Sequence, residues 1–165
     1  MAAKQKAVAT KRYREPSGRH YEQFTVGDVY AHRPGRTISE TDNTWFTLLT
    51  MNQHPLHFDS AYAAETEFGR PLVNSCLTLS MVVGMSVADL SQNAVANLGW
   101  DKIKLTAPVF VGDTIYSESE VLAKRESQSR PGQGIVTVRT TGTKADGTAF
   151  MTFERSFLVP KRGSA

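Results

Sequence analysis

The sequence contains one cysteine, Cys76, in 165 residues. A single thiol cannot form a disulfide within the chain, and it cannot supply a metal site built on several cysteines. A disulfide-stapled secreted scaffold is therefore excluded, and a reducing, cytoplasmic location is expected. No apolar run approaches the ~20 residues of a membrane-spanning helix, and the first residues lack the apolar core of a secretory signal. We therefore expect no membrane association.

Acidic residues are scarce only in the N-terminal segment, residues 1–19. Residues 1–19 contain six lysines and arginines against one acid, Glu15, so this segment carries a charge of +5. Since the whole chain carries +3, the remainder carries −2. This mildly acidic remainder argues against a nucleic-acid-binding surface on the folded part. We expect residues 1–20 to form a flexible basic tail and residues 21–160 to form a single domain.

The first half of the chain contains clear helix signals. Ser39 can cap a helix, and Asp42 stands three residues later in a capping-box arrangement. Apolar residues between positions 45 and 51 follow with the spacing of one helical face. Pro55 disfavours a helical residue before it, so this helix should end near Asn52.

Residues 75–90 form the most apolar stretch of the sequence. Its length and its small residues predict one buried helix that is hydrophobic on most sides. Small residues such as Gly84 would let a sheet approach the helix closely. Cys76 is interpreted as small buried packing, while Met81 and Met85 are expected to pack in the core or to line an apolar tunnel.

Strand signals dominate the second half. Residues 135–143 are rich in valine and threonine, an Asp-Gly pair at 146–147 predicts a hairpin, and residues 149–159 provide the partner strand. An earlier extended run, residues 29–33, is expected to end at a turn formed by Pro34 and Gly35. Helices followed by a strand meander indicate the α+β class, with a curved antiparallel sheet wrapped around the long helix.

The segment TMNQHPLHFD, residues 50–59, concentrates polar chemistry in ten positions. It combines two amides, two histidines and an acid, and it follows a predicted helix. His57 could act as a general acid or base, because the ordinary pKa of histidine, about 6.5, lies near neutrality.

The longer run HPLHFDSAYAAETEFGRPLVNSCLTLSM, residues 54–81, resembles the signature of the MaoC-like dehydratases, which include the R-specific enoyl-CoA hydratases. The resemblance extends over roughly residues 21–159. It implies a hot-dog fold, a homodimer or higher homo-oligomer, and an acyl-CoA substrate with no metal or redox cofactor. The positions that match the family pattern are Pro55, Leu56, His57, Ala63, Phe68, Gly69, Leu77, Thr78 and the strand entry at 107–114.

The same resemblance suggests roles for individual residues. His57 aligns with the catalytic histidine of the family, but Asn52 stands where the family has its catalytic aspartate, and His54 stands where it has an asparagine. Ser75 aligns with the glycine whose amide stabilises the thioester oxyanion. Asn74 replaces a family histidine and could bind the substrate.

A carboxamide cannot accept a proton at neutral pH, so Asn52 leaves three interpretations open. His57 could act as the main base while Asn52 orients water or a substrate carboxylate. Another acid, such as Asp42 or Asp59, could lie nearby in space, although each also suits a place at the start of a helix. In the third interpretation the hydratase activity is lost.

These alternatives define three functional hypotheses. The first is a hydratase or dehydratase of 2,3-enoyl-CoA thioesters, with a branched or carboxylated acyl group, such as mesaconyl, that Asn52 could bind. The second is a hot-dog thioesterase, and the third is a non-catalytic acyl-CoA-binding subunit similar to nodulation protein N. Lys124, Arg125 and Arg130 are either contacts for CoA phosphates or parts of a solvated loop.

Overall fold

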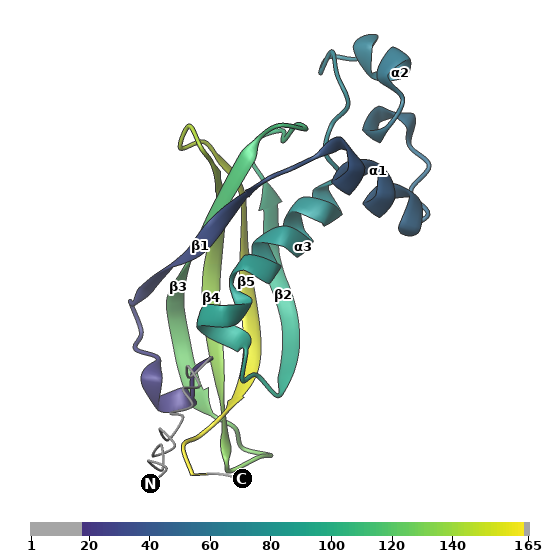
Figure 1. Cartoon of the computed structure of the whole chain (residues 1–165). Coiled ribbons are helices and arrows are strands. Elements are labelled where there is room, and N and C mark those ends of the chain that lie inside the picture. The colour runs from purple at the N-terminus through teal and green to yellow at the C-terminus, as the bar shows by residue number, and fades with distance from the viewer. Residues whose placement is uncertain (1–17, 164–165) are drawn as a thin grey trace, which may run out of the picture.

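The computed structural model describes residues 18–163 and contains one five-stranded antiparallel sheet with a helix across one face (Figure 1). The spatial order of the strands is β1-β3-β4-β5-β2. This arrangement confirms the predicted α+β class. The strands are β1 (Val29–Thr37), β2 (Ala96–Leu105), β3 (Thr114–Glu126), β4 (Gln133–Lys144) and β5 (Ala149–Pro160).

The helix on the sheet is α3 (Ser75–Met85), and the other helical elements lie around it or beyond the sheet. Figure 1 shows α1 and α2 projecting beyond the end of the sheet, close to the start of α3. These other helical elements are η1 (Tyr21–Gln23), α1 (Glu40–Leu49), η2 (Pro55–His57), α2 (Ser60–Ala64) and η3 (Val87–Ser91). No helix within residues 18–163 combines the length and the apolar character of a membrane span.

The start of α1 follows the predicted capping box. The Ser39 hydroxyl accepts a hydrogen bond from the Asp42 amide at 3.1 Å, and the Asp42 carboxylate accepts one from the Ser39 amide at 2.9 Å. Two of the amides that no helical carbonyl can reach are satisfied in this way. The helix ends at Leu49, and Met51 then adopts a left-handed φ of 58°, which turns the chain toward η2.

The predicted helix over residues 75–90 needs correction. The α-helix ends at Met85 and continues as the wider turn η3, and only one of its sides is buried. Leu77 and Val82 pack on the sheet, whereas Cys76 and Gly84 are exposed, so the prediction of a buried Cys76 is wrong for this single chain. The physical reason is that a helix lying on one sheet has a covered side and an uncovered side, whatever its composition.

The predicted turn at Pro34 and Gly35 is also wrong. Strand β1 continues through both residues, and its register with β3 shifts between His32 and Arg36. An irregular edge strand tolerates a proline, which has no N–H to donate. Gly35 is needed for a different reason, because a Cβ there would lie 2.2 Å from the Tyr116 ring.

The hairpin between β4 and β5 is confirmed. Gly147 has a φ of 87°, and the Asp146 carboxylate accepts a hydrogen bond from the Thr148 amide at 2.9 Å. Of the predicted flexible tail, residues 1–17 lie outside the described residues. Arg19, near its end, donates a hydrogen bond to the Asp89 carbonyl at 2.9 Å.

Two hydrophobic clusters cover the sheet, one beneath α3 and one beneath η1 and η3. One surrounds the helix and includes Leu77, Val82 and Phe150, with Met81 and Met85 packed against it. The other gathers around Phe157 and Leu90.

Gly142 on β4 allows the Phe150 ring to lie directly on the sheet, because a Cβ at Gly142 would lie 2.6 Å from the ring. We expect Gly142→Ala to lower the free energy of unfolding by about 1–3 kcal/mol through overpacking. A matched control is Gly84→Ala, where a Cβ meets open space and helix propensity should add about 1 kcal/mol of stability. Urea unfolding measures both, and equal effects of the two variants would contradict this account.

Candidate active site

The buried side chain of Asn43 joins the three segments that form the site. Its amide nitrogen donates to the carbonyl of His57 at 2.8 Å and to that of Leu72 at 3.2 Å. Its amide oxygen accepts the backbone N–H of Asn74 at 2.9 Å. Asn43 is 1% exposed, so water cannot replace these bonds. One side chain of α1 therefore fixes both η2 and the residues that lead into α3.

His57 is half-buried at the end of η2, and its ring orientation is set by one hydrogen bond. Nδ1 lies 2.9 Å from the Leu72 carbonyl oxygen. Because a carbonyl only accepts, Nδ1 carries the proton in the neutral ring and Nε2 presents its lone pair. Among residues 18–163, no hydrogen bond to Nε2 is found. The geometry thus leaves a nitrogen that can accept a proton.

Asn52 and His54 lie in the same turn as His57. The Asn52 amide oxygen accepts the backbone N–H of His54 at 3.0 Å, and His54 Nδ1 accepts that of Leu56 at 3.1 Å. The rings of His54 and His57 are 5.9 Å apart between centroids. Both side chains therefore stabilise the turn that presents His57, in addition to any role toward substrate.

Asn74 caps α3. Its amide oxygen accepts the backbone N–H of Cys76 at 3.0 Å, and its amide nitrogen donates to the Thr47 hydroxyl at 3.3 Å. Both ends of this buried side chain are thus occupied within the protein. Ser75 follows at the first position of the helix and is exposed.

A cavity of about 230 Å³ adjoins His57. It contains two charged residues that the sequence motif did not indicate, Glu40 from the first turn of α1 and Arg70. The Arg70 guanidinium lies 4.0 Å above the Phe110 ring, and this stacking holds it in place. The remaining lining residues are Asn43, Thr44, Phe58, Ser60, Pro71 and Val111.

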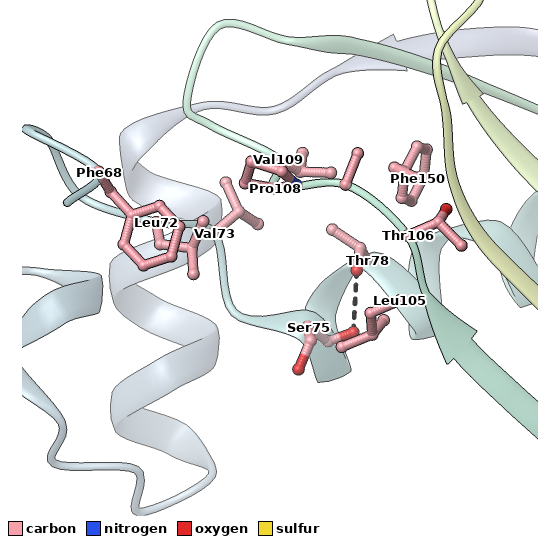
Figure 2. A pocket seen from close by; sticks show the side chains of 11 residues that line it. Phe68, Leu72, Val73, Ser75, Thr78, Leu105, Thr106, Pro108, Val109 and Phe150 are labelled. Carbon is pink, nitrogen blue, oxygen red and sulfur yellow. Dashed lines mark hydrogen bonds between the residues drawn. The ribbon is translucent and has the colours of Figure 1, made fainter.

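A second cavity, of about 330 Å³, lies beside the start of α3 (Figure 2). Its walls are mostly apolar and include Phe68, Val73, Leu105 and Phe150, whereas Ser75 and Thr78 bring polar atoms to it. Ser75 and His57 therefore line different cavities. Leu72 connects the two cavities, because its side chain lines the apolar cavity while its carbonyl oxygen is hydrogen-bonded to the His57 ring.

The two acids considered as replacements for the family aspartate are both engaged at helix starts. Asp59 accepts the Tyr62 amide at 3.0 Å, and Asp42 binds Ser39 and the Arg36 guanidinium. The backbone and hydroxyl hydrogen bonds from Ser39 lower the pKa of Asp42 below its ordinary value. Neither acid lines the His57 cavity, whereas Glu40 does.

The basic residues considered as phosphate contacts lie elsewhere. Lys124 donates to the carbonyls of Tyr21 and Phe24 at 3.1 and 2.7 Å, so it anchors η1 to β3. Arg125 and Arg130 line neither of the two cavities. Residues 18–163 also contain no group of three or more His, Cys, Asp or Glu side chains suited to a metal ion.

Comparisons with known proteins agree with this architecture. The (R)-specific enoyl-CoA hydratase of Rhodospirillum rubrum is 30% identical over 128 residues, which cover 78% of this chain and 84% of that protein. A MaoC domain protein dehydratase of Chloroflexus aurantiacus has a TM-score of 0.84 at 28% identity, covering 99% of this chain and 44% of that chain. A Mycobacterium tuberculosis protein with a double hot-dog fold has a TM-score of 0.82 at 25% identity, covering 90% and 46%. The protein therefore has the MaoC-like hot-dog fold.

Sequence similarity identifies one family among the proteins with this fold. The family model described as mesaconyl-CoA hydratase matches residues 4–165. The mesaconyl-CoA hydratase of Cereibacter sphaeroides is 34% identical over 149 residues, which cover 90% of this chain and 43% of that protein. The chain belongs to the mesaconyl-CoA hydratase family. It spans less than half the length of this curated relative.

The Asn43 contacts yield a prediction about stability. Asn43→Ala leaves the buried amide of Asn74 and the carbonyl of His57 without their partner, so we expect a loss of about 3 kcal/mol in the free energy of unfolding. The control, Asn97→Ala, removes an exposed amide from β2 and should change stability by less than about 0.5 kcal/mol. Urea unfolding separates the two. A loss at Asn43 no larger than that at Asn97 would rule out its joining role.

Proposed function

We propose that this protein catalyses the reversible hydration of a 2,3-enoyl-CoA whose acyl group carries a second carboxylate, as mesaconyl-CoA does. The observation that carries the proposal is that His57, whose Nε2 forms no hydrogen bond within residues 18–163, and the arginine Arg70 line the same cavity. The first group can accept a proton, and the second can bind a carboxylate. Membership of the mesaconyl-CoA hydratase family supports the same substrate class.

In the proposed mechanism His57 acts as the base. Nε2 takes a proton from water as the water oxygen bonds to C3 of the enoyl group, and the resulting imidazolium returns a proton to C2. Water is thereby added without any other reactant. Asn52 cannot accept a proton and does not line this cavity, so we assign it to holding the turn that presents His57, while Glu40 places a carboxylate in the cavity.

Negative charge on the thioester oxygen needs a donor during this addition. We assign that task to the backbone N–H of Ser75, at the start of α3, where helical amides have no helical partner. Asn74 then acts as a positioning residue, since its side chain holds the first turn of the helix. The acyl group is proposed to run from Ser75 past Leu72 to His57.

The wider setting is part of the proposal. We infer a cytoplasmic enzyme with a single domain over residues 21–160, which uses a CoA thioester as substrate and no metal or redox cofactor. A second hot-dog unit is proposed to pair with it, either as another copy of this chain or as a different one. The double hot-dog fold of the Mycobacterium tuberculosis protein supports such pairing.

The role of His57 can be tested by substitution. His57→Gln should lower kcat/KM for mesaconyl-CoA hydration by about 10²–10⁴-fold, because the base is lost. His54→Asn removes an exposed imidazole from the same turn but keeps an acceptor for the Leu56 amide, so it should retain most of the activity. Hydration is followed by loss of enoyl thioester absorbance. Equal losses in the two variants would refute a specific role for His57.

Arg70 is expected to determine the preference of the protein for carboxylated acyl groups. Losing its charge-assisted hydrogen bonds to the distal carboxylate should lower kcat/KM for mesaconyl-CoA by about 10–100-fold in Arg70→Gln. Hydration of crotonyl-CoA, which lacks that carboxylate, should remain nearly unchanged. Arg36→Gln is the control, since Arg36 pairs with Asp42 outside the cavity. Faster hydration of crotonyl-CoA than of any carboxylated substrate by the unaltered protein would overturn the proposed substrate class.

One observation favours a second candidate function. Asn52 replaces the family aspartate, and its amide oxygen is already engaged by the His54 backbone. A non-catalytic acyl-CoA-binding subunit would tolerate this replacement. In that case the protein would bind acyl-CoA without hydrating it, and His57→Gln would leave the binding constant unchanged.

A further inference from the structure

Among residues 18–163, Glu40 is the only acid that lines the His57 cavity. It stands at the first position of α1. In the described part of the chain its carboxylate forms no hydrogen bond and no ion pair, whereas Asp42 and Asp59 are both engaged at helix starts. An acid that lines a cavity and has no partner in the protein can bind a hydrogen-bond donor that enters the cavity.

The hydrogen bonds of Asn43 turn the Glu40 side of α1 toward η2. Residues three and four positions apart lie on the same side of a helix, so Glu40, Asn43 and Thr44 share one side of α1. Asn43 on that side donates to the His57 carbonyl at 2.8 Å, and all three residues line the cavity together with His57. The capping box holds the first turn of the helix, to which Glu40 belongs. The contact that positions His57 therefore also positions Glu40.

Arg70 lines the same cavity but does not pair with Glu40. Within residues 18–163 no ion pair joins the two side chains, and the Arg70 guanidinium stacks 4.0 Å from the centre of the Phe110 ring. Arg70 is thus available for a substrate carboxylate, and Glu40 is available for a donor. Water is the donor that the proposed reaction requires. The cavity of about 230 Å³ has room for a water molecule, which occupies ~30 Å³, beside part of an acyl group.

A water molecule that attacks an enoyl carbon is held best by two acceptors. Nε2 of His57 accepts the proton that is transferred, but one acceptor leaves the water free to rotate about that hydrogen bond. A carboxylate that accepts the second O–H fixes the direction of the oxygen lone pair. It also stabilises the positive charge that develops on the imidazole. The motif of this chain lacks a carboxylate for this task, because Asn52 stands at the position of the family aspartate.

We propose that Glu40 is a catalytic residue, which supplies from α1 the carboxylate that the motif lacks at Asn52. This role rests on the proposed hydratase function. Glu40 and His57 hold one water between them. As the water oxygen bonds to C3, one proton passes to Nε2, and the electron pair of the double bond moves to C2 and the thioester carbonyl. The imidazolium then returns this proton to C2. The other O–H becomes the product hydroxyl, and Glu40 itself gains no proton.

Two substitutions of Glu40 in the full chain test this role. Glu40→Gln should lower kcat by about 10²-fold with mesaconyl-CoA and with crotonyl-CoA alike, because both reactions use the same water, while KM should change by less than about threefold. Glu40→Asp keeps a negative charge at the helix start but withdraws the carboxylate, so kcat should still fall by about tenfold. The control Glu65→Gln removes an exposed acid that lines neither cavity and should leave kcat unchanged.

Glu40 and His57 act on one water molecule, so the effects of their substitution should not add. The double variant Glu40→Gln/His57→Gln should be no more than about threefold slower than His57→Gln alone. The urea midpoints of Glu40→Gln and Glu65→Gln should agree, since both side chains are exposed. A clear fall of the midpoint in Glu40→Gln alone would assign its loss of activity to the structure and overturn the catalytic role.

Full activity of Glu40→Gln beside an impaired His57→Gln would overturn the role of Glu40 and leave the proposed function intact. Full activity of Glu40→Asp, or multiplied losses in the double variant, would have the same meaning. A loss confined to mesaconyl-CoA would make Glu40 a group that selects substrates, and so would also overturn its action on water. Absence of hydration by the unaltered protein would instead overturn the proposed function, and the role of Glu40 with it.

Discussion

The positions of η2 and of residues 72–74, the two segments that flank the candidate site, depend on hydrogen bonds to the carboxamide of Asn43. The helices α1 and α2 project beyond the sheet (Figure 1), and the segment before α3 pairs with the rest of the described chain through a single isolated bridge, between Leu72 and Phe110. A side-chain amide can donate and accept at once, and Asn43 uses both abilities to bind His57, Leu72 and Asn74. Because the Leu72 carbonyl in turn fixes the His57 ring, the tautomer of the proposed base follows from the position of one buried amide.

The two ends of helix α3 lie near chemically different cavities. Near its start, cavities adjoin His57 and Ser75, and the charged residues that line them, such as Arg70, are exposed. Near its end, the buried Arg155 is one of the residues that line a cavity with largely apolar walls. Exposed charges can exchange water for a ligand at little cost, whereas a buried charge is stable only if its surroundings compensate it. The charges near the two ends of α3 therefore differ in how much free energy their desolvation costs.

Local sequence signals predicted local structure well. The capping box at Ser39, the hairpin at Gly147 and the cap at Asp59 each involve residues within three positions of one another. The exposure of Cys76 and the continuation of β1 through Pro34 could not be derived, because they depend on which faces the sheet covers. The segment from Asn52 to His57 was found by its motif, and its catalytic role stays a prediction. Glu40, Arg70 and Arg155 were missed since folding alone brings them to cavities.

The projecting position of α1 and α2 also affects how the protein moves. Strands β3, β4 and β5 share long antiparallel ladders, so their amides can exchange with solvent only when the sheet comes apart. The segment from α1 to α2 has no ladder, and its links to the body include the hydrogen bonds of Asn43 with Leu72 and Asn74. Opening this segment therefore costs less than global unfolding. The part of the molecule that would hold a substrate can loosen and close again while the sheet keeps its register.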